Sequence, residues 1–123
     1  RVADLYSTNE KPAVGPGQSL KEVIVEMTAK RLGITAVINE SGELLGIITD
    51  GDLRRMLEKK VDIDKITAGE IMTANPVTIQ SDELAVDALD LLRKKEISQL
   101  AVTDNKKYLG IIHIHDLVRE GLI

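Results

Sequence analysis

Cysteine, phenylalanine and tryptophan are all missing from the 123 residues, and tyrosine occurs only twice. The lack of cysteine excludes disulfides, thiolate metal sites and thiol nucleophiles, and it leaves the redox compartment open. Because the chain is 43% hydrophobic with almost no aromatic rings, its core must be built from aliphatic side chains. The same shortage removes the surface on which unpaired bases stack.

A surplus of positive charge is missing as well. The chain has 16 Lys and Arg against 20 Asp and Glu, a formal net charge of -4 and a sequence pI near 5.2. This balance opposes binding to nucleic acid, whose phosphate backbone is held by clustered cations. It still allows a small anionic ligand, because a few Arg side chains and backbone N–H groups can hold one phosphate.

Long apolar runs are also absent. No segment approaches the ~20 apolar residues of a membrane-spanning helix, and the opening residues Arg1 to Asp4 lack the apolar core of a signal peptide. We therefore expect a cytoplasmic protein without a membrane partner. The first residue is not Met, which we interpret as the sign of a portion of a longer chain or of a processed product.

What the chain does contain is an internal repeat at an offset of 64 residues. The segment from Glu43 to Ile48 returns as Lys107 to Ile112, and Asp52-Leu53 returns as Asp116-Leu117. We expect a first copy at residues 1–58, a connector of alternating charge at residues 59–67 and a second copy at residues 68–123.

The first copy carries helix and hairpin signals. Ser19 and Glu22 have the spacing of a capping box before an amphipathic segment, and Asp50 or Asp52 is the expected cap of a second helix. The predicted elements are a helix from Leu20, strands at residues 35–39 and 44–49, and a helix from Leu53.

The second copy repeats this order, with Ser81 as the expected helix cap. The predicted elements are a strand at residues 77–79, a helix from Leu84, strands at residues 100–103 and 109–114, and a helix from Asp116. The inward residues of its first helix are predicted to be Leu84, Ala88, Leu91 and Leu92, and Leu117 and Leu122 are the apolar residues expected on the last helix.

A copy of about 55 residues is marginal on surface-to-volume grounds, and its hairpin would leave one face uncovered. We expect the two copies to pack face to face with pseudo-twofold symmetry. The predicted fold class is α+β or α/β, with two β-α-β-β-α motifs and related clefts where they meet.

With this order of predicted elements, the sequence resembles a tandem pair of CBS motifs. The β-α-β-β-α order, the connector motif from Ile71 to Val77 and the Leu-Gly-Ile-Ile strands before Asp-Leu carry the resemblance, which covers the chain from Val2 onward. CBS pairs are regulatory modules, so the resemblance implies a non-catalytic, ligand-binding role and dimerisation through the helices.

Two longer strings are similar to the C-terminal half of bacterial arabinose-5-phosphate isomerases: Thr49 to Arg55 and Leu109 to Arg119. In that family a sugar-isomerase domain precedes the CBS pair and supplies arabinose 5-phosphate for 3-deoxy-manno-octulosonate and lipopolysaccharide synthesis. The resemblance implies such a domain in the same longer chain, and no turnover by these residues themselves.

In CBS pairs a Gly-h-h-Thr-x-x-Asp stretch, where h is hydrophobic, binds ribose through Asp while Thr helps to hold phosphate. The stretch from Gly46 to Asp52 matches this pattern, with Thr49 and Asp52 in the two polar positions. Arg55, and with it Arg54, can complete a phosphate site with forked donors. A plain helix cap is the alternative interpretation of the Asp.

The second copy departs from the pattern because His113 stands where the first has Thr49. With His115 and Asp116 it can contact a phosphate or carboxylate, more strongly when the imidazoles are protonated near a pKa of about 6.5. We expect the two histidines to alternate along a strand and share one face, which also permits a metal site, although no third firm ligand can be named. Polar residues at a strand end are the simpler alternative.

Thr78 is placed to contact a ligand base, as the first strand of the family often does, unless it belongs to an ordinary edge strand. Lys11 begins the equivalent stretch of the first copy. Catalysis finds no support, since there is no cysteine and no Gly-x-Ser-x-Gly elbow.

The leading hypothesis is therefore a sensor of a nucleotide or nucleotide-sugar. For the pathway that the resemblance implies, the effector would be the CMP-activated octulosonate, with AMP or ATP as the runner-up. The competing hypotheses are a structural module that forms a homodimer without a ligand, and a metal sensor.

Overall fold

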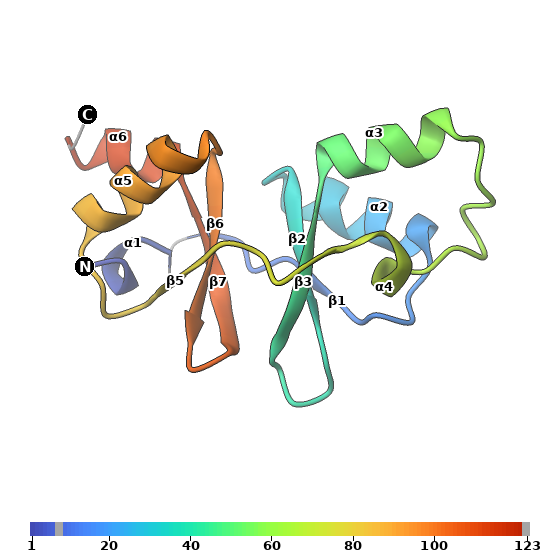
Figure 1. Cartoon of the computed structure of the whole chain (residues 1–123), viewed down its shortest axis with the longest axis horizontal. Coiled ribbons are helices and arrows are strands. Elements are labelled where there is room, and N and C mark those ends of the chain that lie inside the picture. Colours follow the sequence, from blue (N-terminus) through green and yellow to red (C-terminus); the bar gives the residue numbers. More distant parts are fainter. Residues whose placement is uncertain (7–8, 122–123) are drawn as a thin grey trace. The chain divides into compact units, whose positions relative to one another are not determined.

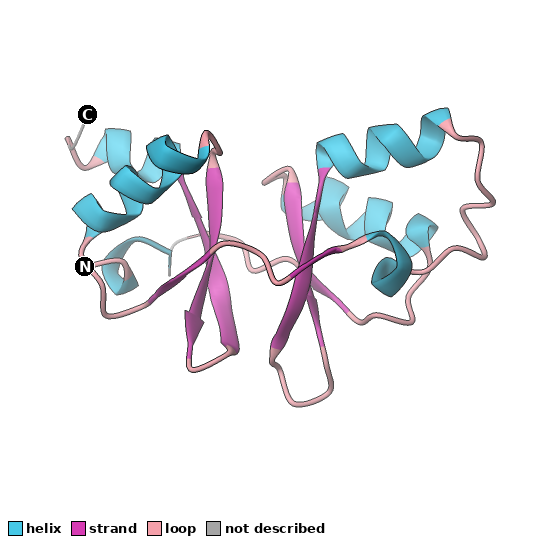
Figure 2. Ribbon diagram, in the orientation of Figure 1, coloured by secondary structure: helices cyan, strands magenta, loops and turns pink. Residues whose placement is uncertain are grey.

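The computed structural model describes residues 1–6 and 9–121, which divide into two compact units. Unit 2 is the continuous segment Pro12–Pro76, and unit 1 joins Arg1–Lys11 to Val77–Ile123. Each unit mixes helices with one sheet (Figures 1 and 2). Within the described ranges no helix combines the length and the apolar character needed to cross a membrane.

Both units contain the predicted β-α-β-β-α order, so the mixed α/β fold class is confirmed. In unit 2 the elements are β1 (Ala13–Val14), α2 (Leu20–Lys30), β2 (Ile34–Ile38), β3 (Leu44–Thr49), α3 (Asp50–Glu58), α4 (Ala68–Ile71) and β4 (Thr73–Ala74). In unit 1 they are α1 (Ala3–Tyr6), β5 (Thr78–Gln80), α5 (Ala85–Lys95), β6 (Gln99–Asp104), β7 (Lys107–His113) and α6 (Ile114–Arg119). The sequence did not predict α1, α4 or β4.

The sheet of unit 2 has the order β1-β2-β3-β4. β1 runs parallel to β2 because α2 connects them, whereas β2 and β3 form an antiparallel hairpin. The aliphatic residues of this sheet pack with those of α2 and α3 to form one hydrophobic core, in which Leu20, Val23 and Ile48 are fully buried. The predicted strand at residues 44–49 is confirmed as β3.

The sheet of unit 1 has the order β5-β6-β7 and repeats the same pairing, with β5 parallel to β6 and β6 antiparallel to β7. Its core is separate from that of unit 2 and includes the fully buried Leu100, Ile112 and Leu117. The predicted contact of Leu117 is therefore confirmed, and Leu122 lies outside the described residues. Val2 joins this core from the other end of the chain with 0% exposure.

A short segment lies against β3 in unit 2 and against β7 in unit 1, and in each case a glycine makes room for it. In unit 2, β4 pairs antiparallel with β3, so that Ala74 lies opposite Gly46. In unit 1, the ring of Tyr6 lies over Gly110, where an added Cβ would come within 2.8 Å of the ring. The repeated Leu-Gly-Ile-Ile motif is thus explained by a close approach at the glycine.

Three predictions about the helix starts are wrong. Ser81 does not cap α5, which begins at Ala85 after Leu84; the backbone of Ser81 instead forms hydrogen bonds with Thr103 and Ala3. Leu84 is 48% exposed and does not face the core; Leu89 is the buried residue instead. The cap of α3 is Thr49, not Asp50 or Asp52, because the helix starts one turn earlier than the apolar pattern suggests.

Candidate functional site

The turn between β3 and α3 brings Thr49, Asp52 and Arg55 together in unit 2. Thr49 is the N-cap, and its backbone N–H and hydroxyl donate to Asp52 Oδ2 at 2.9 and 3.1 Å. The N–H of Asp52 donates back to the Thr49 hydroxyl at 3.4 Å. This reciprocal capping box forms because both side chains are short and stand three residues apart at a helix start.

Arg55 completes the cluster from one turn further along α3. Its Nη2 donates to Asp52 Oδ1 at 2.5 Å, and its side chain is 63% exposed, whereas that of Asp52 is 15% exposed. A carboxylate offers about four acceptor positions, and three donors occupy this one. The free position, the exposed Arg55 and the positive end of a nine-residue helix favour a ligand that carries both hydroxyl and anionic groups.

The second copy builds the same motif at the start of α6, with His113 as the N-cap. The His113 N–H donates to Asp116 Oδ2 at 2.7 Å, and Arg119 donates to Asp116 Oδ1 through a short contact. Arg119 stands where the first copy has Arg55, so both copies present a box followed by an arginine. Asp116 is only 3% exposed.

The two histidines stack, but not as neighbours on one strand. β7 ends at His113 and His115 lies in the first turn of α6, so the predicted alternation along a strand is wrong. Their ring centroids are 4.4 Å apart, because the Nδ1 of His113 accepts the backbone N–H of His115 at 3.0 Å. Within residues 1–6 and 9–121, no group of three His, Cys, Asp or Glu side chains could hold a metal ion.

Burial lowers the pKa of His113, and the nearby charge of His115 lowers it further. Asp116 opposes this effect, while Arg119 adds to it. The acceptor role of Nδ1 agrees with a neutral ring, since a protonated imidazole has no acceptor.

Asn9 is a member of the second cluster that the sequence did not single out. Its side-chain amide donates to Asp116 Oδ2 at 2.8 Å and to the carbonyl oxygen of Ile111 at 2.9 Å. Asn9 lies three residues before Pro12, as Thr73 lies three residues before Pro76. This alignment identifies Asn9 and Thr73 as equivalent positions of the two copies, but only the tertiary structure brings Asn9 next to Asp116.

Thr78 lies on β5 in the sheet row that contains Ala101 and Ile111. His113 is two residues further along β7, opposite Gln99. Thr78, His113, His115 and Asp116 therefore belong to unit 1, and Thr49, Asp52 and Arg55 belong to unit 2.

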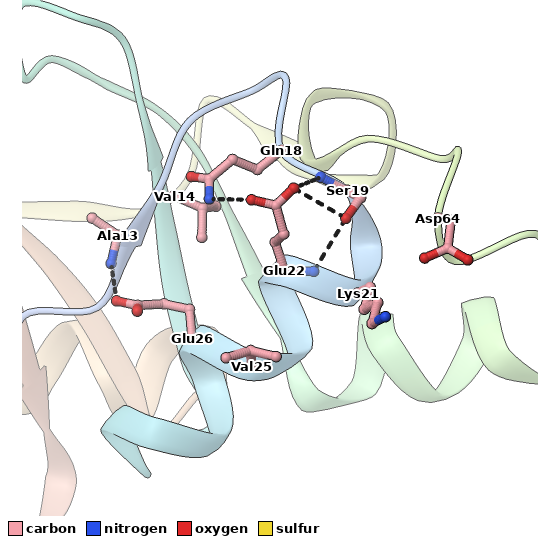
Figure 3. Close-up of a pocket in the computed structure, with 9 residues that line it drawn as sticks. All are labelled: Ala13, Val14, Gln18, Ser19, Lys21, Glu22, Val25, Glu26 and Asp64. Carbon is pink, nitrogen blue, oxygen red and sulfur yellow. Dashed lines mark hydrogen bonds between the residues drawn. The ribbon is translucent and has the colours of Figure 1, made fainter.

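A separate groove of about 630 Å³, which was not predicted from the sequence, lies beside α2 (Figure 3). Its charged lining residues are Glu22, Glu26, Asp64 and Lys21, and Val25 is 62% exposed within it. Hydrogen bonds from Gln18 and Ser19 lower the pKa of Glu22, so this carboxylate stays ionised. The acidic lining makes the groove a poor phosphate site compared with the α3 turn.

The fold, with its repeated β-α-β-β-α order and its paired capping boxes, defines a class of tandem-repeat domain, and comparison with known families agrees. The model of the CBS domain matches residues 2–59 and again residues 68–122, so the chain belongs to the CBS domain family. A CBS domain crystal structure with 25% sequence identity superimposes with a TM-score of 0.85, over 99% of this chain and 97% of the other.

Two further relatives are informative. The arabinose 5-phosphate isomerase KdsD of Yersinia pestis is 37% identical over 124 aligned residues, which cover 100% of this chain and 38% of that enzyme. The chain thus spans well under half the length of this relative. A CBS domain pair solved with 5′-methylthioadenosine and S-adenosyl-L-methionine is 28% identical, with a TM-score of 0.80 over 98% of this chain and 94% of that one.

Proposed function

We propose that this CBS pair is a non-catalytic sensor that binds a nucleotide or nucleotide-sugar at the turn between β3 and α3. The observation that carries the proposal is the partly exposed carboxylate of Asp52, held at a helix N-terminus beside an exposed arginine. A ribose offers hydroxyl donors to that carboxylate, and its phosphate is an anion suited to the helix terminus.

Each residue of the cluster has a defined role in this proposal. Asp52 accepts from the ribose hydroxyls through its free acceptor position. Arg55 turns from Asp52 toward the phosphate, which its 63% exposure permits, and the Thr49 hydroxyl donates to a phosphate oxygen. Arg54 is exposed on the same turn and adds positive charge. In the second copy, the residues that we expect to contact a ligand of that copy are Thr78, His113 and His115.

The larger protein in this proposal is a cytoplasmic arabinose-5-phosphate isomerase. The similarity to KdsD across the whole of this chain supports it, and the remaining length of that enzyme leaves room for a sugar-isomerase domain. The effector would then be the CMP-activated octulosonate at the end of the lipopolysaccharide branch.

An adenine nucleotide is the second candidate ligand. The solved CBS pair at 28% identity holds two adenosine derivatives, and the ribose and its hydroxyls are common to both candidates. The two effectors differ in the base and in the group beyond the phosphate, so one binding series separates them.

The test is titration calorimetry with the CMP-octulosonate ester, CMP, AMP and ATP. We expect Asp52→Ala to weaken binding by at least roughly tenfold, the scale of a lost charge-assisted hydrogen bond. Asp50→Ala is the matched control, because Asp50 is an exposed acid on the same turn outside the capping box. Equal affinities for wild type and Asp52→Ala would refute the site, and selectivity among the four ligands identifies the effector.

A purely structural module is the alternative that the helices favour. Several apolar helix residues are exposed, among them Val25 at 62%, Leu57 at 52% and Val118 at 49%. A homodimer would cover such residues. Sedimentation at several concentrations, with Leu57→Lys as the variant, separates this alternative from the sensor: a dimer that binds no nucleotide supports it.

A further inference from the structure

The carboxylates of the two capping boxes receive their donors in the same arrangement. On Asp52, Oδ2 accepts the backbone N–H and the hydroxyl of Thr49, and Oδ1 accepts from Arg55. On Asp116, Oδ2 accepts the backbone N–H of the cap residue at 2.7 Å, and Oδ1 accepts from Arg119. The turn of the second copy therefore supplies every donor of the first copy except a counterpart of the threonine hydroxyl.

The missing donor comes from the other end of the chain. The Nδ1 of His113 accepts the backbone N–H of His115 at 3.0 Å, so this ring atom is an acceptor and donates nothing. The side-chain amide of Asn9 donates to Asp116 Oδ2 at 2.8 Å instead, close to the 3.1 Å of the threonine hydroxyl in the first copy. Asn9 thus replaces a hydroxyl that the histidine cap lacks.

The position of Asn9 depends on the docking of the segment before β1. Its amide also donates to the Ile111 carbonyl at 2.9 Å, and its backbone N–H donates to the Tyr6 carbonyl at 3.0 Å. The helix α1, which ends at Tyr6, is anchored by Val2 in the core of unit 1. The second donor on Asp116 Oδ2 is therefore present only while this segment is docked.

The Oδ1 atom of Asp116 is the one that a ligand can reach. Its donor is the side chain of Arg119, which is 66% exposed, whereas the donors on Oδ2 are a backbone N–H and the anchored amide of Asn9. The carboxylate torsion χ2 of an aspartate has no sharply preferred value, so the donors on Oδ2 decide which way Oδ1 points. The amide of Asn9 therefore orients the atom that is left for a ligand.

We propose that Asn9 is a positioning residue for Asp116 in the ligand site of the second copy. Asp116 presents Oδ1 to a ribose hydroxyl in the correct orientation only while the segment before β1 is docked. Because linkage is reciprocal, a ligand in the second copy stabilises the docking of that segment in return. This inference rests on the proposed function, because it assigns the capping-box carboxylates to ribose.

Titration calorimetry with AMP and CMP tests the role of Asn9 in chains that carry Asp52→Ala, so that binding reports the second copy. In this background we expect Asn9→Ala to weaken binding by roughly tenfold, the scale of one hydrogen bond to a charged group. The same change should have little effect when His113→Thr is also present, because a threonine cap brings its own hydroxyl to Oδ2. Thr73→Ala is the matched control, since Thr73 is the exposed equivalent of Asn9 in unit 2.

This double-mutant cycle separates positioning from other roles of Asn9. An equal loss on Asn9→Ala with and without His113→Thr would show that Asn9 acts elsewhere, and it would overturn the proposal. Tighter binding on Asn9→Ala would also overturn it, because the amide would then occupy a position that the ligand uses.

The same titrations distinguish this inference from the proposed function. If wild type binds a nucleotide and Asp52→Ala binds none, Asp116 serves no ligand; the inference fails and the α3 site stands. If Asp52→Ala binds like wild type, the α3 site fails, and the cycle on Asn9 still decides the role of Asp116. If wild type binds neither nucleotide, both proposals fail.

Hydrogen exchange measures the reciprocal effect on the start of the chain. The backbone N–H groups of Val2 and Ala3 donate to the carbonyls of Glu83 and Ser81, both at 2.9 Å, so their exchange reports the docking of the segment. We expect this exchange to slow by roughly fivefold when AMP saturates Asp52→Ala, and to stay unchanged when Asn9→Ala is added. Unchanged exchange in Asp52→Ala with bound AMP would overturn the linkage.

Discussion

Gly46 and Gly110 occupy equivalent positions on β3 and β7, and each lies against another segment of its unit. A Cβ at Gly46 would come within 2.6 Å of the Thr73 carbonyl oxygen and 2.7 Å of the Met72 sulfur. At Gly110 the nearest atoms belong to the Tyr6 ring, at 2.8 Å. A side-chain ring can turn aside more easily than a paired backbone strand, so the two glycines differ in how much change they tolerate.

We expect Gly46→Ala to lower the free energy of unfolding by roughly 1 to 3 kcal/mol, the range for overpacked sites. Gly110→Ala should cost less because Tyr6 can move. Gly17→Ala serves as the control, since nothing lies within 4 Å of its added Cβ. Urea unfolding measures all three, and equal stability of Gly46→Ala and Gly17→Ala would contradict the close-approach argument.

His113 makes the stability of unit 1 depend on pH. Its pKa in the folded state lies below the ordinary value of 6.5, through burial and then the charge of His115, with Arg119 adding to the effect and Asp116 opposing it. As the pH falls below about 6.5, the unfolded chain therefore takes up a proton that the folded protein resists. The free energy of unfolding therefore decreases as the pH decreases across this window.

The substitution His113→Thr tests this sign, because Thr is the cap that the first copy uses at the same position. It removes the titrating ring and keeps an oxygen at the N-cap. We expect the loss of stability between about pH 7.5 and about pH 5.5 to be smaller in His113→Thr than in wild type. Identical pH profiles from urea unfolding would show that His113 has no part in the pH dependence.

At the scale of elements, α2 depends on its capping box. Ser19 and Glu22 accept and donate reciprocally, with the Glu22 N–H donating to the Ser19 hydroxyl at 3.2 Å. Ser19→Ala leaves an N–H of the first turn without this partner, so we expect a loss of about 1 kcal/mol in the free energy of unfolding. Ser81→Ala is the contrast, since α5 has no side-chain cap, and it should cost clearly less. A larger effect at Ser81 than at Ser19 would reverse this assignment.

The elements that the sequence predicted well are those with a strong local signal. The hydrophobic run Leu44–Thr49 coincides with β3, and the Ser19 signature marks the start of α2. The start of α5 was misplaced for a physical reason. Its first turn is held by backbone hydrogen bonds to the carbonyl oxygen of Leu84, and any residue can supply such an acceptor. The short elements α1 and β4 were not predicted because tertiary contacts stabilise them and they show no local periodicity.

In the candidate site, too, residues that are close in sequence were found from the sequence, and a residue far away in sequence was not. The sequence singled out Thr49, Asp52, His113 and Asp116 as site residues, but it did not predict that Thr49 and His113 are the N-caps that pair with the acids three residues later. The contact of Asn9 with Asp116 spans nearly the whole chain, and no local pattern encodes it. Their roles in ligand binding, with those of Arg55, Thr78 and His115, stay predictions.

At the scale of the whole molecule, the chain has two aliphatic cores, and the first residues belong to the one built by the last. The repeat boundaries assign residues 1–58 to the first copy, whereas the compact units place Arg1–Lys11 with Val77–Ile123. The repeat in the sequence and the packing of the chain thus follow different boundaries at the N-terminus.

Val2→Ala tests this assignment. Removing buried methyl groups from the core of unit 1 should lower its stability by roughly 1 to 3 kcal/mol. The effect should appear as faster hydrogen exchange in β6 and β7, while β2 and β3 of unit 2 remain protected. Val25→Ala is the control, because Val25 is 62% exposed and should change little. Faster exchange in β2 and β3 instead would contradict the assignment of Val2 to the core of unit 1.

The division into a continuous and a discontinuous unit has a consequence for synthesis of the chain. A ribosome releases residues in order, so unit 2 possesses every residue it needs once Pro76 has emerged. Val2 and α1, although made before unit 2, must wait for Leu117 before their core exists. During that interval Val2 and α1 are undocked, and a bound partner or a protease can reach them until α6 is complete.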